Sequence, residues 1–316
     1  MSIKVIIPGP LSSIQDFGRL GYQDIGFSVS GAADKNAARI ANILVGNNES
    51  EAVIEMTIIG MTVQFMANTV ISITGANMSP HLNGNLIENY KAIAVKENDY
   101  LSFKHAENGC RGYIACSGGF DIPKVMGSYS TGLKYKIGGY KGRKLETGDI
   151  ILLKKSIDIL PNMENRILKP PTYKNEVILD AILGPQDDYF SSRMIETFFN
   201  SNYKVTSESD RMGLRLEGEK ITSEKGVDII SDGIALGSVQ IPASGQPIIL
   251  FVDRQTTGGY AKVATVTGYS IEEAGQLMSG NIIKFNKVTV EYAQKEYIRR
   301  EKEIFKLNKK INRKKY

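Results

Sequence analysis

The sequence predicts a mainly β protein with a few helices, and three observations support this class. Apolar stretches rich in Val, Ile, Tyr or Phe are short, and most are bounded by Gly, Asn, Asp or Pro, as is typical of strands. The 31 glycines are spread along the chain, as expected where many turns need a positive φ. Helical periodicity is scarce. This profile favours barrels or sandwiches over a parallel doubly wound sheet.

Ten segments carry the strand pattern most clearly. We predict strands at Lys4–Ile7, Met61–Phe65, Val70–Ile73, Ala92–Val95, Tyr100–Phe103, Tyr113–Ser117, Ile150–Leu153, Val177–Ile182, Ile248–Val252 and Ile282–Phe285. They lie throughout the first 290 residues, so the β character belongs to the whole body of the chain.

Helices are predicted at three places in this body. In Ala33–Leu44 apolar residues recur three and four positions apart and Gly46 follows as a stop signal. We favour Asp34 as the N-cap of this helix over a ligand-binding role. Tyr189–Phe199 and Ile271–Leu277 are weaker candidates.

The chain is predicted to form two lobes. Residues 154–175 contain three prolines and no clear strand pattern, which predicts a linker between an N-terminal β lobe (1–153) and a C-terminal β-barrel lobe (176–290). A faint repeat supports two lobes, because Leu145–Ile151 resembles Leu277–Ile283. Each copy is a Gly-Asp or Gly-Asn turn that leads into an apolar strand, and we expect each to close its lobe.

The positive charge is concentrated at the C-terminal end. The chain has a net charge of +5, but Lys295–Tyr316 alone holds ten Lys or Arg and three acids, which leaves a body of net −2. We therefore predict no nucleic-acid partner. Residues 291–316 are predicted as a solvated basic helix that frays at its end, with contact to an acidic partner or polyanion as the alternative.

The sequence also indicates the cellular compartment of the protein. The longest apolar runs, such as Ile248–Val252, fall far short of the ~20 residues of a membrane-spanning helix, and the start of the chain lacks a signal-peptide pattern. Two cysteines, Cys110 and Cys116, cannot build a disulfide framework and are interpreted as small buried hydrophobes rather than nucleophiles. We expect a cytoplasmic protein without a membrane partner.

Several familiar chemistries have no sequence basis. Neither standard phosphate-binding glycine loop is present. The two histidines, His81 and His105, lack metal-ligand spacing, so we predict no metal site built on His or Cys. Neither histidine lies near a Gly-x-Ser-x-Gly elbow, which disfavours a Ser-His-Asp triad.

Four stretches contain more polar residues and glycines than turns require, and we take them as candidate binding segments. In the first, Asp16 and Arg19 form a local pair or contact a ligand. In the second, Ser128, Ser130 and Thr131 lie among glycines, where they receive a phosphate or only make turns. In the third, Asp210, Arg211 and Arg215 bind a ligand or have a structural role, such as an Asp210–Arg211 ion pair.

The fourth stretch follows the apolar strand Ile248–Val252. Arg254 and Lys262 supply fixed positive charge, and Asp253 acts as a base or holds one of them in place. Glycines among hydroxyl and amide groups allow backbone N–H groups to face an anion. The combination suits a carboxylate, carboxyphosphate or ureido ligand, and the alternative is a hairpin whose polar groups cap strand ends. The other candidate residues here are Gln240, Gln255, Thr256, Thr257, Gly258, Gly259 and Tyr260.

Together these stretches resemble one family, over about residues 3–290 and in the expected order. The matching pieces are Gln15-Asp16-x-Gly18-Arg19, Ser30-Gly31-Ala32-x-Asp34, Gly75-Ala76-Asn77, Gly127-Ser128-x-Ser130-Thr131, Gly184-Pro185-Gln186, Ser209-Asp210-Arg211-Met212-Gly213-x-Arg215, Gln240-x-Pro242 and Asp253-Arg254-Gln255-Thr256-Thr257-Gly258-Gly259-Tyr260. The sequence resembles the biotin-dependent carboxyltransferase-like family. That family includes a 5-oxoprolinase subunit, allophanate hydrolase subunit 2-like proteins, the carboxyltransferase half of urea carboxylase, and the antagonist of a sporulation-kinase inhibitor.

The resemblance implies cyclophilin-like β-barrel lobes and a subunit that is inactive without its partners. These partners would be a sister subunit of the 5-oxoprolinase or kinase-inhibitor type and a lactam-binding third subunit. The implied activity is ATP-dependent hydrolysis of 5-oxo-L-proline to L-glutamate, with ATP, with or without Mg²⁺, as cofactor. Asp253, Arg254 and Lys262 are the implied catalytic residues, and we expect Asp253–Lys262, Gln240 and Asp210–Arg215 to line one cleft.

Two other functions fit the same resemblance. One is the carboxyltransferase component of a biotin-dependent urea carboxylase or allophanate-type system, with biotin on a separate carrier. The other is a non-catalytic antagonist that binds an inhibitor-like partner. The chain departs from the family pattern at Tyr129, where a basic residue is usual, at Asn77, where an acid is common, and at the insert Lys134-Tyr135-Lys136.

Overall fold

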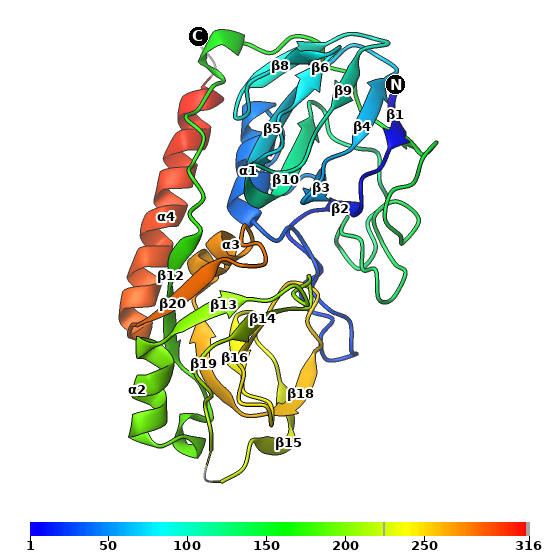
Figure 1. Ribbon diagram of the computed structural model, residues 1–316. Coiled ribbons are helices and arrows are strands. Elements are labelled where there is room, and N and C mark those ends of the chain that lie inside the picture. The colour runs from blue at the N-terminus through cyan, green and yellow to red at the C-terminus, as the bar shows by residue number, and fades with distance from the viewer. Residues whose placement is uncertain (224, 314–316) are drawn as a thin grey trace. The chain divides into compact units, whose positions relative to one another are not determined.

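The computed structural model describes residues 1–223 and 225–313, which form two units (Figure 1). Unit 1 contains Met1–Arg19, Ser30–Tyr173 and residues 303–313, and unit 2 contains Leu20–Val29 and the described part of Lys174–Lys302. The division thus differs from two consecutive lobes, because one short segment near the start belongs to unit 2 and the end of the last helix belongs to unit 1.

Unit 1 is built from two antiparallel sheets. The six-stranded sheet has the order β11 (Ile150–Leu152), β1 (Ser2–Ile7), β4 (Thr62–Phe65), β9 (Tyr100–Ser102), β6 (His81–Leu82) and β7 (Asn85–Leu86). The five-stranded sheet has the order β2 (Ser12–Gln15), β3 (Val53–Thr57), β10 (Asn108–Cys116), β5 (Thr69–Asn77) and β8 (Ala92–Val95). Buried side chains of both sheets form one apolar core.

Helix α1 (Lys35–Leu44) packs on β5 and β10 of unit 1. The Asp34 side chain accepts from the N–H of Ala37, which confirms the predicted N-cap. At the other end of the helix, the buried Arg166 guanidinium donates to the carbonyl of Leu44 at 2.9 Å. The segment predicted as a linker therefore packs on unit 1 up to Tyr173, and it includes the short 3₁₀ helix η1 (Met163–Asn165).

Unit 2 is a closed seven-stranded barrel. Its order is β12 (Glu176–Leu183), β19 (Lys262–Val266), β16 (Ser238–Gln240), β17 (Ile248–Leu250), β14 (Gly213–Glu217), β13 (Asn202–Val205) and β20 (Ile282–Lys287). The parallel pairing of β20 with β12 closes it, and the other pairings are antiparallel. The predicted mainly β fold with barrel character is confirmed, and the closed barrel is in unit 2.

Smaller elements surround the barrel strands in unit 2. The 3₁₀ helix η2 (Asp187–Tyr189) precedes α2 (Ser192–Asn200), whose Phe198 ring stacks on Phe285 with centroids 4.5 Å apart. Helix α3 (Gly268–Ala274) follows β19, and β15 (Asp228–Gly233) pairs with β18 (Thr257–Tyr260) as a separate two-stranded sheet.

The predicted repeat has the same hydrogen bonds in both copies. In each copy, a glycine with positive φ donates its N–H to the carbonyl of a valine. The backbone carbonyl of the residue after the glycine accepts from the N–H of the same valine. The side chain of the same Asp or Asn accepts from an N–H three residues earlier. The residues are Gly148, Asp149, Val5 and Glu146 in unit 1, and Gly280, Asn281, Val205 and Met278 in unit 2. The turn leads into β11, paired with β1, in unit 1, and into β20, paired with β13, in unit 2.

The basic C-terminal segment forms helix α4 (Val290–Ile311), as predicted. In unit 2 its Arg300 lies over the Tyr269 ring, 4.5 Å from the centroid. In unit 1 its Ile304, Leu307 and Ile311 pack with the end of α1. The helix thus continues to residue 311, and the predicted fraying concerns the end of the chain, where Lys314, Lys315 and Tyr316 lie outside the described residues. Within those residues, no helix combines the length and the apolar character needed to cross a membrane.

The anchoring of α4 is tested by truncating one of its buried side chains. Ile311→Ala should lower the free energy of unfolding by about 2 kcal/mol, because it leaves a cavity beside Ile43 and Leu44. Ile298→Ala, on an exposed position of the same helix, should change it by less than about 0.5 kcal/mol. Urea unfolding of both variants measures the difference, and equal effects would show that the end of the helix is not anchored.

Candidate functional site

Asp16 is the centre of a buried polar network in unit 1. Its carboxylate accepts from the hydroxyls of Ser128 at 2.6 Å and Ser130 at 2.5 Å. It also accepts from the backbone N–H of Tyr129 at 2.7 Å and of Gly18 at 2.8 Å. Asp16 is only 6% exposed, so these four donors replace the water that the carboxylate has lost. The network ties residues 127–131 to the end of β2.

This geometry favours the turn-making alternative for Ser128, Ser130 and Thr131. All three are fully buried, and the Thr131 hydroxyl donates to the carbonyl of Ile14 at 3.0 Å. A phosphate placed against their hydroxyls would approach the Asp16 carboxylate, and the like charges would repel each other. Arg19, which is also buried, donates to the backbone carbonyl of Ser130.

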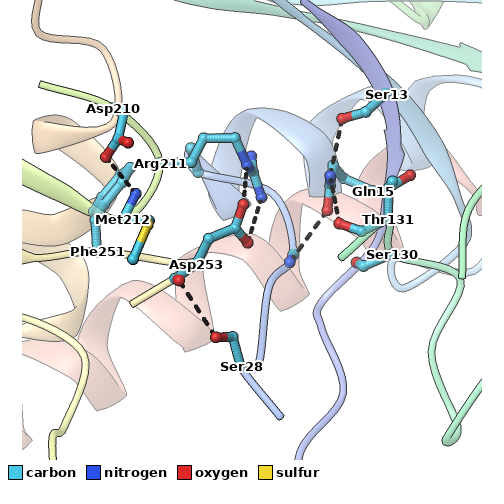
Figure 2. A network of polar contacts seen from close by, with 12 residues as sticks. Ser13, Gln15, Ser28, Ser130, Thr131, Asp210, Arg211, Met212, Phe251 and Asp253 are labelled. Atoms are coloured by element: carbon cyan, nitrogen blue, oxygen red, sulfur yellow. Dashed lines mark hydrogen bonds and ion pairs between the residues drawn. The ribbon is translucent and has the colours of Figure 1, made fainter. Parts of the chain in front are cut away.

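The amide of Gln15 extends this network, and Figure 2 shows it beside Ser13 and Thr131. Its Nε2 donates to the Ser13 hydroxyl at 2.9 Å, and its Oε1 accepts from the Gly31 N–H at 3.2 Å. Gly31 has φ +99°, and a Cβ there would lie 3.0 Å from the Gly18 nitrogen. The glycine is therefore required by the close approach of two chain segments.

In unit 2, Arg211 and Asp253 form a buried bidentate ion pair (Figure 2). Arg211 Nε lies 2.8 Å from Asp253 Oδ2, and a second guanidinium nitrogen lies 3.3 Å from Oδ1. Asp253 thus holds Arg211, whereas the sequence suggested Arg254 or Lys262 as its partner. Asp210 accepts from the backbone N–H of Met212 at 2.8 Å, which closes the turn.

Arg254 is a buried cation without a carboxylate partner among the described residues. It is 5% exposed, and it donates to the backbone carbonyls of Ile234 at 3.1 Å and Phe251 at 3.3 Å. Burial lowers the pKa of its guanidinium to about 10, so the group is still protonated at pH 7. The Ser28 hydroxyl donates to the carbonyl of Arg254 at 2.6 Å and thereby anchors Leu20–Val29 on this turn.

The glycine-containing segment after Arg254 is a strand rather than the predicted loop. Gly258 and Gly259 lie in β18, and neither has a positive φ. A Cβ on Gly258 would lie 2.8 Å from Nε2 of Gln240. The glycine therefore makes room for Gln240, whose amide is 3.5 Å from the carbonyl of Tyr260. The side chains of Thr257 and Tyr260 are exposed, and those of Gln255 and Thr256 are half-buried.

The two remaining cationic candidates differ in burial. Lys262, at the start of β19, is buried and its Nζ lies 2.8 Å from Asp232 Oδ2. Arg215 is exposed on β14, 3.8 Å from Glu208, and lines a cavity of about 360 Å³ with Gln246 and other residues of unit 2. The structure therefore brings together Arg211 with Asp253, and Gln240 with Tyr260, while Arg215 lies outside these contacts.

Sequence analysis missed a cavity of about 830 Å³ in unit 1. Asn77, Ser79, Glu107 and Tyr173 are among its lining residues. Glu107 accepts from Asn77 Nδ2 at 2.9 Å and from the Ser79 hydroxyl at 2.6 Å. Asn77 departs from the family pattern, but Glu107 and Tyr173 come from distant segments, so no local motif indicates the cavity.

The buried Tyr90 and Tyr113 and the half-buried Tyr173 form a network next to this cavity. The Tyr173 hydroxyl lies 3.1 Å from that of Tyr90 and 3.4 Å from Asp34 Oδ2. The Tyr113 hydroxyl donates to Glu55 at 2.9 Å and accepts from the N–H of Asp34 at 2.8 Å. Burial, and then the nearby carboxylates, raise the pKa of all three phenols above the usual value. These groups thus stay neutral donors, and Asp34 joins the network as well as capping α1.

The remaining titratable candidates are inert or dispersed. Cys110 and Cys116 are buried thiols, and burial raises the pKa of Cys116 to about 12. Within residues 1–223 and 225–313, no three His, Cys, Asp or Glu side chains gather as metal ligands.

Unit 1 has two sheets and unit 2 has a closed barrel, and in both a turn of the same type precedes the strand β11 or β20. These features define a two-part β protein of the carboxyltransferase class. The family model described as carboxyltransferase domain, subdomain A and B, matches residues 25–287. The chain belongs to this family.

Relatives with established names support the assignment over nearly the whole chain. The sequence is 36% identical to a 5-oxoprolinase subunit of Escherichia coli over 293 residues, which are 93% of each chain. It is 34% identical to urea amidolyase of Saccharomyces cerevisiae over 92% of this chain but only 17% of that protein. The crystal structure of Kluyveromyces lactis urea amidolyase superposes with a TM-score of 0.89 and 30% identity, over 96% of this chain and 20% of that one.

The structural role of Asp16 is tested by Asp16→Asn. The amide nitrogen would face hydroxyl and N–H donors, so buried donors lose their acceptor, and we expect the free energy of unfolding to fall by about 3 kcal/mol. Asp121→Asn, at an exposed position of unit 1, is the matched control and should have almost no effect. Denaturant unfolding compares them. An Asp16→Asn variant as stable as the control would contradict the network.

The thiols are tested by their reactivity towards Ellman's reagent. Because burial raises the pKa of both, neither Cys110 nor Cys116 should react in the native chain at pH 8, and both should react in 6 M guanidinium chloride. The number of thiols that react is measured by absorbance at 412 nm. A fast-reacting native thiol would contradict their assignment as buried hydrophobes.

Proposed function

We propose that this protein is a subunit of a cytoplasmic, ATP-dependent 5-oxoprolinase that hydrolyses 5-oxo-L-proline to L-glutamate. The observation that carries the proposal is the 36% identity to the Escherichia coli 5-oxoprolinase subunit over 93% of both chains. The corresponding 5-oxoprolinase subunit of Haemophilus influenzae is 35% identical over the same shares. Since both relatives are named as subunits, the proposal includes a sister subunit and a lactam-binding subunit as partners.

Hydrolysis of the lactam requires positive charge at a site from which water is excluded. A lactam is a poor electrophile. Negative charge develops on its carbonyl oxygen as water adds to the carbon, and this charge returns to the C=O bond when the C–N bond breaks. Arg254 and Lys262 are buried cations of unit 2, so their attraction for an oxyanion is weakly screened. In this proposal Arg254 stabilises that charge, and the Arg211–Asp253 pair positions the turn from which Arg254 projects.

Nucleotide binding is assigned to another part of the complex. ATP, with or without Mg²⁺, supplies the driving force for opening the lactam. The loop at Ser128–Thr131 does not fit a triphosphate, because the Asp16 carboxylate already occupies its hydroxyl and N–H donors. We therefore derive no step of nucleotide chemistry from this chain.

The carboxyltransferase function is the second candidate. The family model and the 34% identity to yeast urea amidolyase favour it. It needs biotin on a separate carrier, whereas the matched part of urea amidolyase is 17% of a much longer chain. A non-catalytic antagonist of an inhibitor-like partner is the outcome if the complex forms without turnover.

Reconstitution separates the three functions. The chain is combined with its sister and lactam-binding subunits, and ADP and glutamate are measured with and without 5-oxo-L-proline. Equal amounts of ADP and glutamate that depend on the lactam are expected. Turnover only with carboxybiotin and urea would transfer the assignment to the carboxyltransferase, and complex formation without either reaction would indicate the antagonist.

The role of Arg254 is tested in the same complex by Arg254→Met. Loss of a buried cation that faces developing charge should lower kcat about 10²–10³-fold. The melting temperature should change little, because removing a desolvated charge that no carboxylate balances offsets the loss of the two hydrogen bonds to the carbonyls of Ile234 and Phe251. Arg193→Met, on the exposed side of α2, is the control and should retain activity. Full turnover by Arg254→Met would refute the role.

A further inference from the structure

Lys262 is a buried ammonium group with spare hydrogen-bonding capacity. Its side chain is only 2% exposed, although an ammonium group has three N–H donors to satisfy. Among the described residues, its Nζ contacts one acceptor, Asp232 Oδ2 at 2.8 Å. Two donors are therefore left in a position where water is scarce, and a ligand oxygen beside Nζ would receive a charge-assisted hydrogen bond.

The partner of Lys262 comes from an exposed strand. The Asp232 side chain is 54% exposed, and the other residues of β15 are exposed or nearly so. Within the described part of the chain, the strand pairs with β18 alone and is not part of the barrel. An acidic group on such a strand can return to water at low cost, which a carboxylate in the barrel wall could not do.

The surroundings of Asp232 define what the position binds. One carboxylate oxygen accepts from Lys262, and the other accepts from the Gly233 N–H at 2.7 Å. The hydrogen bond from Lys262, then those from Gly233 and the Gln186 amide, lower the pKa of the Asp232 carboxyl. Gln186 also accepts from the backbone N–H of Lys262 at 3.2 Å. An ammonium and two neutral groups thus already hold a carboxylate.

We propose that Asp232 is an internal carboxylate that occupies an oxyanion site at Lys262, and that a carboxylate or phosphate group of a ligand displaces it. The proposal rests on the proposed function in that 5-oxo-L-proline carries such a carboxylate. Lys262 then binds the ligand, and Asp232 sets its affinity by competition. The apparent affinity is reduced by the fraction of molecules in which Asp232 occupies the site.

The test measures binding to the full-length chain by isothermal titration calorimetry. Three probes distinguish the source of the oxyanion: 5-oxo-L-proline, its carboxylate-free analogue 2-pyrrolidinone, and inorganic phosphate. If Asp232 occupies the site in about nine molecules of ten, Asp232→Asn should bind 5-oxo-L-proline or phosphate about tenfold more tightly than the wild type. The affinity for 2-pyrrolidinone should not change.

Matched variants identify the groups involved. Asp228→Asn removes another exposed acid from β15 and should change the affinities by less than about twofold, so a general charge effect is separated from competition. Lys262→Met should remove anion binding in the wild type and in Asp232→Asn. Lys262→Gln, which keeps a donor, is the second variant if the methionine variant fails to fold.

The outcomes separate this proposal from the proposed function. A gain in anion affinity that is specific to Asp232→Asn and needs Lys262 supports the internal carboxylate, even if the reconstituted complex does not hydrolyse 5-oxo-L-proline. No gain with either anion, no detectable binding by Asp232→Asn, or an equal gain in Asp228→Asn overturns it, even if the complex is an active 5-oxoprolinase.

Discussion

The cost of removing positive charge from water constrains the arrangement of unit 2. Three cationic side chains are buried there, and each is stabilised differently. Among the described residues, Arg211 has a buried carboxylate in bidentate geometry, Arg254 has backbone carbonyls alone, and Lys262 has a carboxylate from an exposed strand. In the first arrangement, the charge of Arg211 is already balanced by Asp253. Arg254 leaves positive charge that an anion from outside can balance, and the carboxylate at Lys262 can be exchanged for one from a ligand, which is why the two proposals depend on these groups.

Unit 1 illustrates the opposite arrangement with similar residue types. Its buried charge at Asp16 is negative, and three of the four donors around it, two hydroxyls and one N–H group, belong to the loop at residues 127–131. Because the hydroxyls of Ser128 and Ser130 already donate to Asp16, the glycine- and serine-containing loop has a structural role: it connects two segments of unit 1. Sequence motifs of Gly, Ser, Asp and Arg therefore do not by themselves distinguish a binding loop from a structural one. The two are distinguished by the sign of the buried charge and by whether that charge already has a partner.

Local patterns predicted the scaffold well and the site poorly. All ten predicted strands overlap observed ones, and Asp34 caps α1, because alternation and capping act over a few residues. The partners of the buried charges depend on topology instead. Asp253 lies 42 residues from Arg211, and Asp232 lies 30 residues from Lys262. The strand β18 was missed because glycines usually indicate turns, whereas Gly258 is required by the packing of Gln240.

The difference between Asp253 and Asp232 determines where a ligand can compete. Asp253 is buried with its arginine, so an incoming anion would have to leave that carboxylate desolvated and unpaired, which is strongly unfavourable. Asp232 is more than half exposed, so a ligand that takes its place at Lys262 releases it into water and restores its hydration. Exchange of one carboxylate for another also keeps the charge beside the buried ammonium constant. The barrel wall can therefore hold Lys262 in a desolvated position at all times, and selectivity for an anionic ligand follows from the group that the ligand must replace.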